Sequence, residues 1–345
     1  MEPNAEERQE KPYELIDFIP GQPQRQAGVG HEALHVATIS GRFELYLIAR
    51  TPVQVASGSF DVAKTKQGEE IAAQGSSIQR YSAEGGKVSK QLLLPGSSLK
   101  GMVRNLLEMI SPCCVATVAN TLRRELPSAL ARCSKVDQLC PACRLFGMSG
   151  SGTENYQGQI SIEDAILVDG GPVLARTPLL WTPADGGRRF PERYLRGNIA
   201  RGRKLYYPSL PATGADARIA LKQGSTLRTQ FHFTNLTPAE MGLLLAALGL
   251  HPDYRFIPKI GGGKPVGLGS VETYLNQVLV YGEIKRSGRL GGQPLPYNGD
   301  SLAAQVKEWV QAATDAHLLN EAALQVVADV LHLRNLKRSP VEGVY

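Results

Sequence analysis

The chain has 345 residues, of which 42% are hydrophobic, and it carries a formal net charge of +6 with a pI near 9.0. This length predicts one large or two medium domains with a sizeable core, and the lack of any apolar run of about 18 residues excludes a transmembrane helix and a membrane partner. The amino terminus at 1–7 is acidic, whereas a signal peptide begins basic and then becomes apolar, so we expect a cytoplasmic location.

Hydrophobic periodicity in the first third of the chain predicts four segments in order. Residues 1–40 show little periodicity and predict an extended amino-terminal segment, and residues 42–50 alternate at period two, which indicates a strand. The polar, glycine-containing stretch 56–91 predicts a long functional or mobile loop. A helix capped by Ser97 or Ser98 follows. Its apolar face is expected to consist of Leu99, Met102, Val103, Leu106, Leu107 and Ile110.

Two basic residues, Lys100 and Arg104, lie four positions apart on another face of this predicted helix. Free backbone N–H groups and the helix dipole favour an anion near a helix amino terminus. We therefore expect these residues to bind phosphate, and a solvated pair of cations is the alternative.

The remaining elements predict an α+β fold. Strands are expected at 158–168 and 226–233, and Thr237-Pro-Ala-Glu240 predicts a capping box for a helix that ends at Gly249. Further strands at 269–274 and 277–281 precede two helices at 300–314 and 320–334. The order strand, helix, strand, strand, helix, strand is typical of the ferredoxin-like (RRM-like) fold. We expect such a core at 41–285, with insertions at 109–147 and 170–222, and a carboxyl-terminal helical segment at 286–345.

All five cysteines lie between Cys113 and Cys143. Cys140-Pro-Ala-Cys143 has the two-residue gap that allows two thiolates of one turn to ligate a tetrahedral zinc ion. We expect a structural zinc bound by Cys114, Cys133, Cys140 and Cys143, with Cys113 as the alternative to Cys114. A redox Cys-x-x-Cys pair and unligated cysteines are the competing interpretations. A catalytic zinc is disfavoured, because no histidine lies between His35 and His232.

The excess positive charge is concentrated in one segment. Between Arg188 and Lys222 there are nine basic residues and two acidic ones, and Arg188 and Arg189 begin the series. Cations neutralise phosphates and flat rings stack on unpaired bases, so this mixture favours single-stranded nucleic acid, with a solvated basic loop as the alternative. The aromatic residues in and beside the segment are Trp181, Phe190, Tyr194, Tyr206 and Tyr207.

The motif His31-Glu-Ala-Leu-His35 matches the pattern of zinc metalloproteases. That pattern works only on a helix, where the two imidazoles share a face. Glycines before it and β-branched residues after it indicate a loop that enters a strand, so a protease is disfavoured.

The glycine-rich stretch Gly261–Gly269 lacks the spacing of a nucleotide-binding loop, and Pro265 stands where a magnesium-binding hydroxyl would be. We expect Gly262, Gly263 and Lys264 to bring backbone N–H groups and one ammonium group to an RNA backbone. A tight connector is the alternative.

Taken together, five segments over roughly 40–280 resemble the RAMP (repeat-associated mysterious protein) superfamily of CRISPR effector proteins, and the cysteine turn is similar to that of type III members. The segments are 51–58 after the first strand, 94–108 at the helix entrance, the turn 140–147, the strand 158–165 and the loop 261–269.

This resemblance implies a backbone subunit that binds CRISPR guide RNA beside other effector subunits of a type III complex. Lys100, Arg104 and Lys264 would hold guide phosphates, and 170–222 would form a thumb-like hairpin between guide and single-stranded target RNA. The resemblance also implies that Asp61 cleaves the target with Mg²⁺ or Mn²⁺. A non-catalytic backbone or capping subunit and an endoribonuclease that processes precursor CRISPR RNA are the alternatives.

Overall fold

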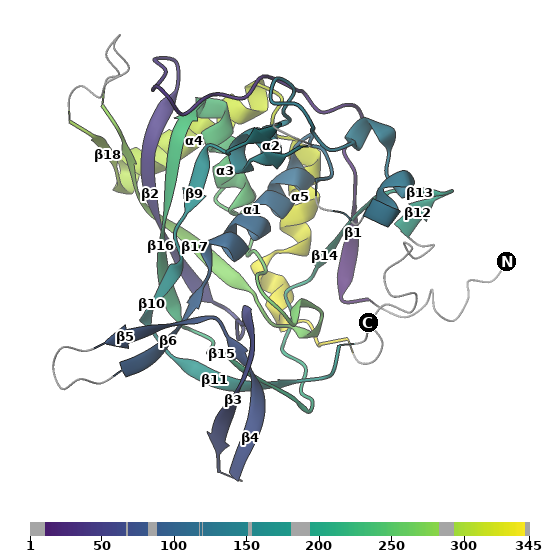
Figure 1. The fold of residues 1–345 in the computed structure, drawn as a ribbon, viewed down its shortest axis with the longest axis vertical. Helices are drawn as coiled ribbons and strands as arrows, with labels where there is room; N and C mark the ends of the chain where they lie inside the picture. The colour runs from purple at the N-terminus through teal and green to yellow at the C-terminus, as the bar shows by residue number, and fades with distance from the viewer. Residues whose placement is uncertain are drawn as a thin grey trace.

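In the computed structural model, the alternating segment predicted as a strand lies at the centre of the largest sheet (Figure 1). Its inward-facing side chains, Phe43, Leu45 and Leu47, are buried, as period-two alternation requires. Phe43 stacks on Phe231 of a neighbouring strand with 4.8 Å between ring centroids. The sheet runs in the order β18 (Leu295–Tyr297), β17 (Val271–Val280), β2 (Ile39–Ala49), β16 (Thr226–Leu236), β10 (Ala165–Asp169), β6 (Val88–Leu94) and β5 (Ser77–Tyr81), with β9 (Ile160–Ile162) also paired to β16.

The structure describes most of the chain. The described ranges are 11–66, 68–81, 88–116, 118, 120–150, 154–180, 194–282 and 293–341. Arg188 and Arg189, expected to bind RNA, lie outside these ranges, as do Trp181 and Phe190.

Helices cover one face of the central sheet (Figure 1). All three leucines at 243–245 of α3 are fully buried, because the helix packs against α1 and α4 as well as the sheet. The predicted capping box of Thr237 and Glu240 is confirmed, and Gly249 ends the helix with φ of 77°. The helices are α1 (Gly96–Ile110), α2 (Pro141–Phe146), α3 (Pro238–Ala247), α4 (Gly299–Asp315) and α5 (Glu321–Val330).

The predicted serine cap of α1 is wrong. The helix begins at Gly96, before either serine, and the residue at its amino-terminal cap, Pro95, makes no side-chain capping hydrogen bond. Instead, the Gly96 N–H donates to Asp164 Oδ1 at 2.7 Å. The cap comes from the connection between β9 and β10, which is distant in sequence and not recognisable from the local pattern.

The loop predicted at 56–91 is also wrong, because most of this stretch forms strands. β3 (Ala56–Thr65) and β4 (Gly68–Gly75) make a hairpin that projects from the body of the molecule (Figure 1). Phe60 and Val62 on this hairpin are exposed, so the stretch lacks the buried alternation that identifies a strand. The hairpin extends a second sheet, in the order β11 (Pro172–Thr177), β15 (Asp216–Leu221), β4 and β3.

The described part of the insertion 170–222 does not form the single hairpin that we expected. Its two ends, β11 and β15, pair with each other, but the residues between them join two other sheets. β14 (Gly202–Tyr206) pairs with the amino-terminal strand β1 (Tyr13–Asp17), so the amino-terminal segment 1–40 contains regular structure. Two shorter pairs are β12 (Leu195–Arg196) with β13 (Ile199–Ala200), and β7 (Met148–Ser149) with β8 (Asn155–Tyr156).

The two strands predicted at 269–274 and 277–281 are one strand, β17, with an irregularity in register between Leu275 and Gln277. The two predicted carboxyl-terminal helices are confirmed as α4 and α5. Within the described ranges, no helix combines the length and the apolar character needed to cross a bilayer.

Candidate functional site

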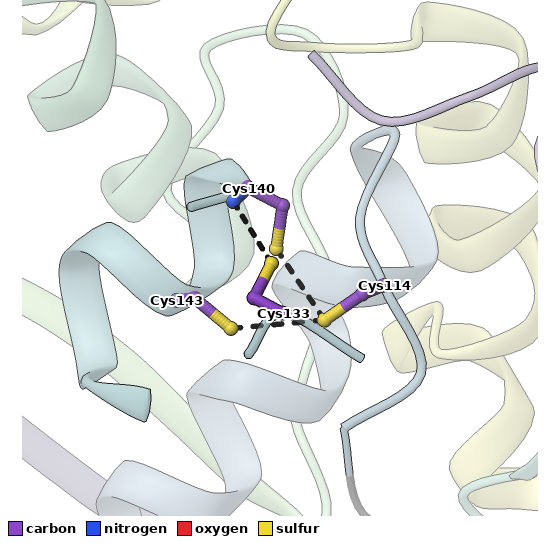
Figure 2. A group of neighbouring side chains, drawn as sticks. All are labelled: Cys114, Cys133, Cys140 and Cys143. Carbon is purple, nitrogen blue, oxygen red and sulfur yellow. Dashed lines mark hydrogen bonds between the residues drawn. The ribbon is translucent and has the colours of Figure 1, made fainter. Parts of the chain in front are cut away.

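Four buried cysteines meet in one cluster (Figure 2). The Sγ atoms of Cys114, Cys133, Cys140 and Cys143 all lie within 4.8 Å of one another, and Cys114 is 3.6 Å from both Cys140 and Cys143. A tetrahedral Zn²⁺ with Zn–S bonds of about 2.3 Å separates its sulfur atoms by about 3.8 Å. The cluster could therefore hold a metal such as zinc with little rearrangement.

The local sequence explains how these ligands converge. Cys140 stands at the amino-terminal cap of α2, Pro141 fixes the first turn, and Cys143 lies on that turn. Cys133 accepts a hydrogen bond from the Cys140 N–H at 3.2 Å. The group contains Cys114, which follows α1, and not its neighbour Cys113, which is buried beside it.

Contacts among the sulfur atoms divide the thiols of the cluster: the pKa values of Cys133 and Cys140 are lowered, and those of Cys114 and Cys143 are raised. Hydrogen bonds from Cys113 and then Cys114 hold the pKa of the Cys140 thiol well below its usual value. The guanidinium group of Arg104 lies against the cluster, with Nη2 at 3.3 Å from Cys143 Sγ. A cation beside a metal-binding sulfur offsets part of the negative charge of four thiolates.

The phosphate contact predicted for Arg104 stays a prediction, and in the structure its guanidinium group makes contacts within the protein. Its Nε donates to Glu108 Oε1 at 2.8 Å, and its Nη1 donates to the Gly147 carbonyl at 2.9 Å. Glu108, whose side chain is only 3% exposed, also accepts from Arg203 Nη2 at 2.5 Å. Arg104 therefore links the cysteine cluster to β14 through a buried chain of charges.

Beside this network lies a cavity of about 440 Å³ between α1, β14 and the glycine-rich stretch. Ser98, Gly101 and Asn105 face it from successive turns of α1. The described residues that line it include three lysines and no acidic residue, which makes the cavity basic. The lysines are Lys204, Lys259 and Lys264.

The glycine-rich stretch acts both as a connector and as a wall of the cavity. Gly263 has φ of 67°, which favours glycine, and a Cβ at that position would meet Leu268 Cδ1 at 2.7 Å. We expected the Gly262 N–H to face a ligand. In the structure it donates to the Gln54 carbonyl at 2.8 Å and so holds the loop in place. Lys264 does line the cavity, and burial lowers the pKa of its ammonium group.

Lys100 is absent from the described residues that line the cavity. It lies two positions from Ser98, which places it on a different side of α1. Burial and then the charge of Arg104 lower the pKa of Lys100. The structure therefore brings Lys264 to the cavity and leaves Lys100 and Arg104 outside it.

The described part of the basic segment, 194–222, is largely engaged within the protein. The Nζ of Lys204 lies 4.5 Å from the ring centroid of Tyr13, 5.2 Å from Tyr194 and 5.7 Å from Tyr206. Arg201 pairs with Asp17 at 3.0 Å. The alternation of cations and rings in this part of the sequence therefore reflects internal cation–π contacts and ion pairs, and not the open stacking platform that we expected.

Asp61 lies on β3 and not on a mobile loop. Its Oδ2 atom pairs with Lys90 Nζ at 2.9 Å, and its Oδ1 atom accepts from the Val62 N–H at 2.9 Å. The hydrogen bond from Lys90 and then that from Val62 lower the pKa of the carboxyl group. Within the described ranges, Asp61 does not belong to a group of residues spaced to hold a metal.

The His31–His35 motif is not helical, as expected, and His31 Nε2 lies 3.1 Å from the Gln157 carbonyl. Lys259 is the residue of the cavity that sequence reasoning missed. In the sequence it is a single lysine within the apolar run Ile257-Pro258-Lys259-Ile260. Such a lysine does not identify a site unless the structure shows what surrounds it.

A family model described as the RAMP superfamily matches residues 46–272, well over half of the chain. The protein therefore belongs to the RAMP superfamily, and this membership indicates CRISPR-associated RNA binding. No curated protein matches the chain.

Proposed function

We propose that this protein is a backbone subunit of a type III CRISPR effector complex, and that it binds guide RNA in the cavity between α1, β14 and the glycine-rich stretch. The observation that carries this proposal is a lysine-lined, acid-free cavity in a chain of the RAMP superfamily. Phosphate contacts from lysines give affinity without base selectivity, which suits a subunit that must accept any guide sequence.

We also propose that the centre of the molecule is a ferredoxin-like core. The strand order β17, β2, β16, β10 supports this, because the first and fourth core strands then flank each other and the third lies between the first and second. The position of α1 and α3 on one face of these strands agrees with it (Figure 1).

The metal that best fits the cysteine cluster is zinc. Four thiolates around one ion leave no open position for substrate, so its role would be structural. When bound, the ion would supply folding free energy by joining the end of α1 to α2 and the loop that carries Cys133.

For target RNA, the thumb role implied by the resemblance fits the β3–β4 hairpin better than 170–222. The hairpin projects, and it carries Phe60 and Ile71, which are 71% and 74% exposed. Asp61 on the same hairpin is the proposed site of cleavage, through a hydrated Mg²⁺ or Mn²⁺ bound by one carboxylate. Its ion pair with Lys90 is the specific observation that favours the alternative, a non-catalytic subunit.

The test is a reconstituted complex with a labelled guide and a complementary target RNA, assayed with and without divalent metal. Metal-dependent cutting that Asp61→Asn abolishes, at unchanged target affinity, supports the catalytic subunit. Target binding without cutting supports the non-catalytic one. If this chain protects no part of the guide from nuclease, the backbone role itself is wrong.

A further inference from the structure

The most deeply buried cation of the cavity is Lys259, whose residue is only 6% exposed. Its Nζ donates to the carbonyl oxygens of Tyr207, at 2.9 Å, and Lys264, at 3.0 Å. Among the described residues, no carboxylate forms an ion pair with it. Within the described ranges, two carbonyl dipoles are therefore what compensates the charge of the buried ammonium group.

An ammonium group has three N–H donors, and the two carbonyls accept only two of them. A buried charge without a counter-ion is unfavourable, so such a group either loses its proton or acquires an anion. Lys259 lines the cavity, so an anion can reach it.

We propose that Lys259 is the buried counter-charge for one phosphate group of bound RNA, seated in the cavity between α1, β14 and the glycine-rich stretch. This inference rests on the proposed RNA-binding function and assigns its recognition element. Lys204 and Lys264 add positive charge from two other walls, and Ser98 and Asn105 offer neutral donors from α1.

A consequence is that binding takes up a proton. Burial and then the charge of Lys264 lower the pKa of Lys259 to about 7 in the free protein. A phosphate beside the ammonium group stabilises the charged form and raises this pKa again. The affinity for RNA is therefore constant below pH 7 and falls as the pH rises above it.

The other ionisable groups around Lys259 do not supply this pH dependence in the same way. β14 contributes Lys204 and Tyr206 to the cavity, the glycine-rich stretch contributes Lys264, and α1 contributes no ionisable side chain. Tyr207, whose backbone carbonyl accepts from Lys259, has Arg338 at 4.1 Å from its ring centroid, and its hydroxyl group donates to Glu14. Lys264, with its own lowered pKa, is the group that the experiment must separate.

The experiment is calorimetric titration of the full chain with a short single-stranded RNA, in two buffers of different ionisation enthalpy at pH 7.5 and pH 8.5. We expect the wild-type protein to take up between about half a proton and one proton. Lys259→Met should remove that uptake and weaken binding about tenfold or more, because hydrogen bonds to charged groups contribute about 1.5–3 kcal/mol. Lys264→Met should weaken binding and keep most of the uptake, because burial is the larger cause of the lowered pKa of Lys259. The matched control is Lys307→Met, an exposed lysine of α4, which should change neither.

RNA with a terminal phosphate is compared with the same RNA ending in hydroxyl groups. Equal binding assigns the site to an internal phosphodiester, and a loss with hydroxyl ends assigns it to a terminal phosphate. Wild-type binding without proton uptake overturns the inference, and it does so even if Lys259→Met fails to fold. If the chain binds no RNA, the proposed function fails, and titration with inorganic pyrophosphate decides this inference separately. Pyrophosphate binding with proton uptake that Lys264→Met retains supports it, and no such binding overturns it.

Discussion

At the scale of single residues, the protein keeps two charged groups in unusual surroundings. Among the described residues, Lys259 is buried with two carbonyl partners, and Arg104 is held between a carboxylate and a cysteine sulfur. The environment of Lys259 affects the free energy of unfolding, and that of Arg104 affects the affinity for a metal.

The free energy of unfolding should rise with pH because of Lys259. Its pKa is about 7 in the folded protein and near 10.5 when unfolded, so the unfolded state binds more protons between these values and stability increases with pH. The gain between pH 7 and pH 9 is about 2 kcal/mol. Denaturant unfolding at pH 7 and at pH 9 gives the change in the free energy of unfolding for the wild-type protein and for Lys259→Met. The difference between these two changes measures the contribution of Lys259. An equal change of the free energy of unfolding with pH in both proteins would mean that Lys259 stays charged in the folded protein.

Arg104→Ala should weaken metal binding by roughly tenfold to a hundredfold, the usual effect of losing a residue that supports metal ligands. The mutation removes the cation beside Cys143 and leaves Glu108 with Arg203 as its remaining ion pair. Chelator competition followed by a zinc-sensitive dye measures the affinity. Arg123→Ala, an exposed arginine on a short 3-10 helix, is the control and should retain metal as the wild type does.

At the scale of elements, the predictions succeeded where the determinants are local. The alternation of β2 and the capping box of α3 each specify an element from a few neighbouring residues. The β3–β4 hairpin was missed because β15, the strand that joins it to the second sheet, is far away in the sequence and because its exposed side chains include apolar ones. The Cys140–Cys143 spacing predicted a cluster that the fold does assemble. The roles of Arg104 and Lys259 depend on contacts with β14 and the loop, which no local pattern encodes.

The exposed face of the β3–β4 hairpin should matter for target RNA more than for stability. Phe60 and Ile71 bury little surface, so Phe60→Ser with Ile71→Ser should change the free energy of unfolding by less than about 0.5 kcal/mol for each substitution. The complex should nevertheless bind target RNA more weakly at unchanged guide affinity. Filter binding with target RNA checks this. Val326→Ser, at an exposed position of α5, is the control, and an equal loss in that variant would assign the effect to stability.

At the scale of the whole molecule, the cysteine cluster and the amino-terminal segment form one connected structure. The Gln26 N–H donates to the Leu139 carbonyl at 3.0 Å, and the Gly28 N–H donates to the Val136 carbonyl at 2.7 Å. Arg25 also donates to the Ala131 carbonyl at 2.7 Å. The segment around Cys133 is therefore held on one side by the cysteine cluster and on the other by residues 25–28 of the amino-terminal segment.

Metal removal should release the segment around Cys133 and residues 25–28 at the same time. Structural zinc contributes folding free energy on the order of 10 kcal/mol, so a chelator should expose the backbone of 127–139 and of 25–28 together. Hydrogen exchange measured before and after chelation reports this as loss of protection at the Gln26 and Gly28 amides. Cys140→Ser should give the same pattern with lower soluble yield and metal content. If the protein as purified contains no zinc, the cluster has another role.

The pairing of β1 with β14 also constrains how the protein is made on the ribosome. Tyr13 is synthesised early, but its partner Tyr206 follows much later, and the last wall of the cavity comes later still, at 259–264. At about 5–20 residues per second, the first strand waits on the order of ten to forty seconds for its partner. A nascent chain therefore has no complete cavity until residues 259–264 have emerged, so the guide RNA that we propose as its ligand can bind only after that point of synthesis.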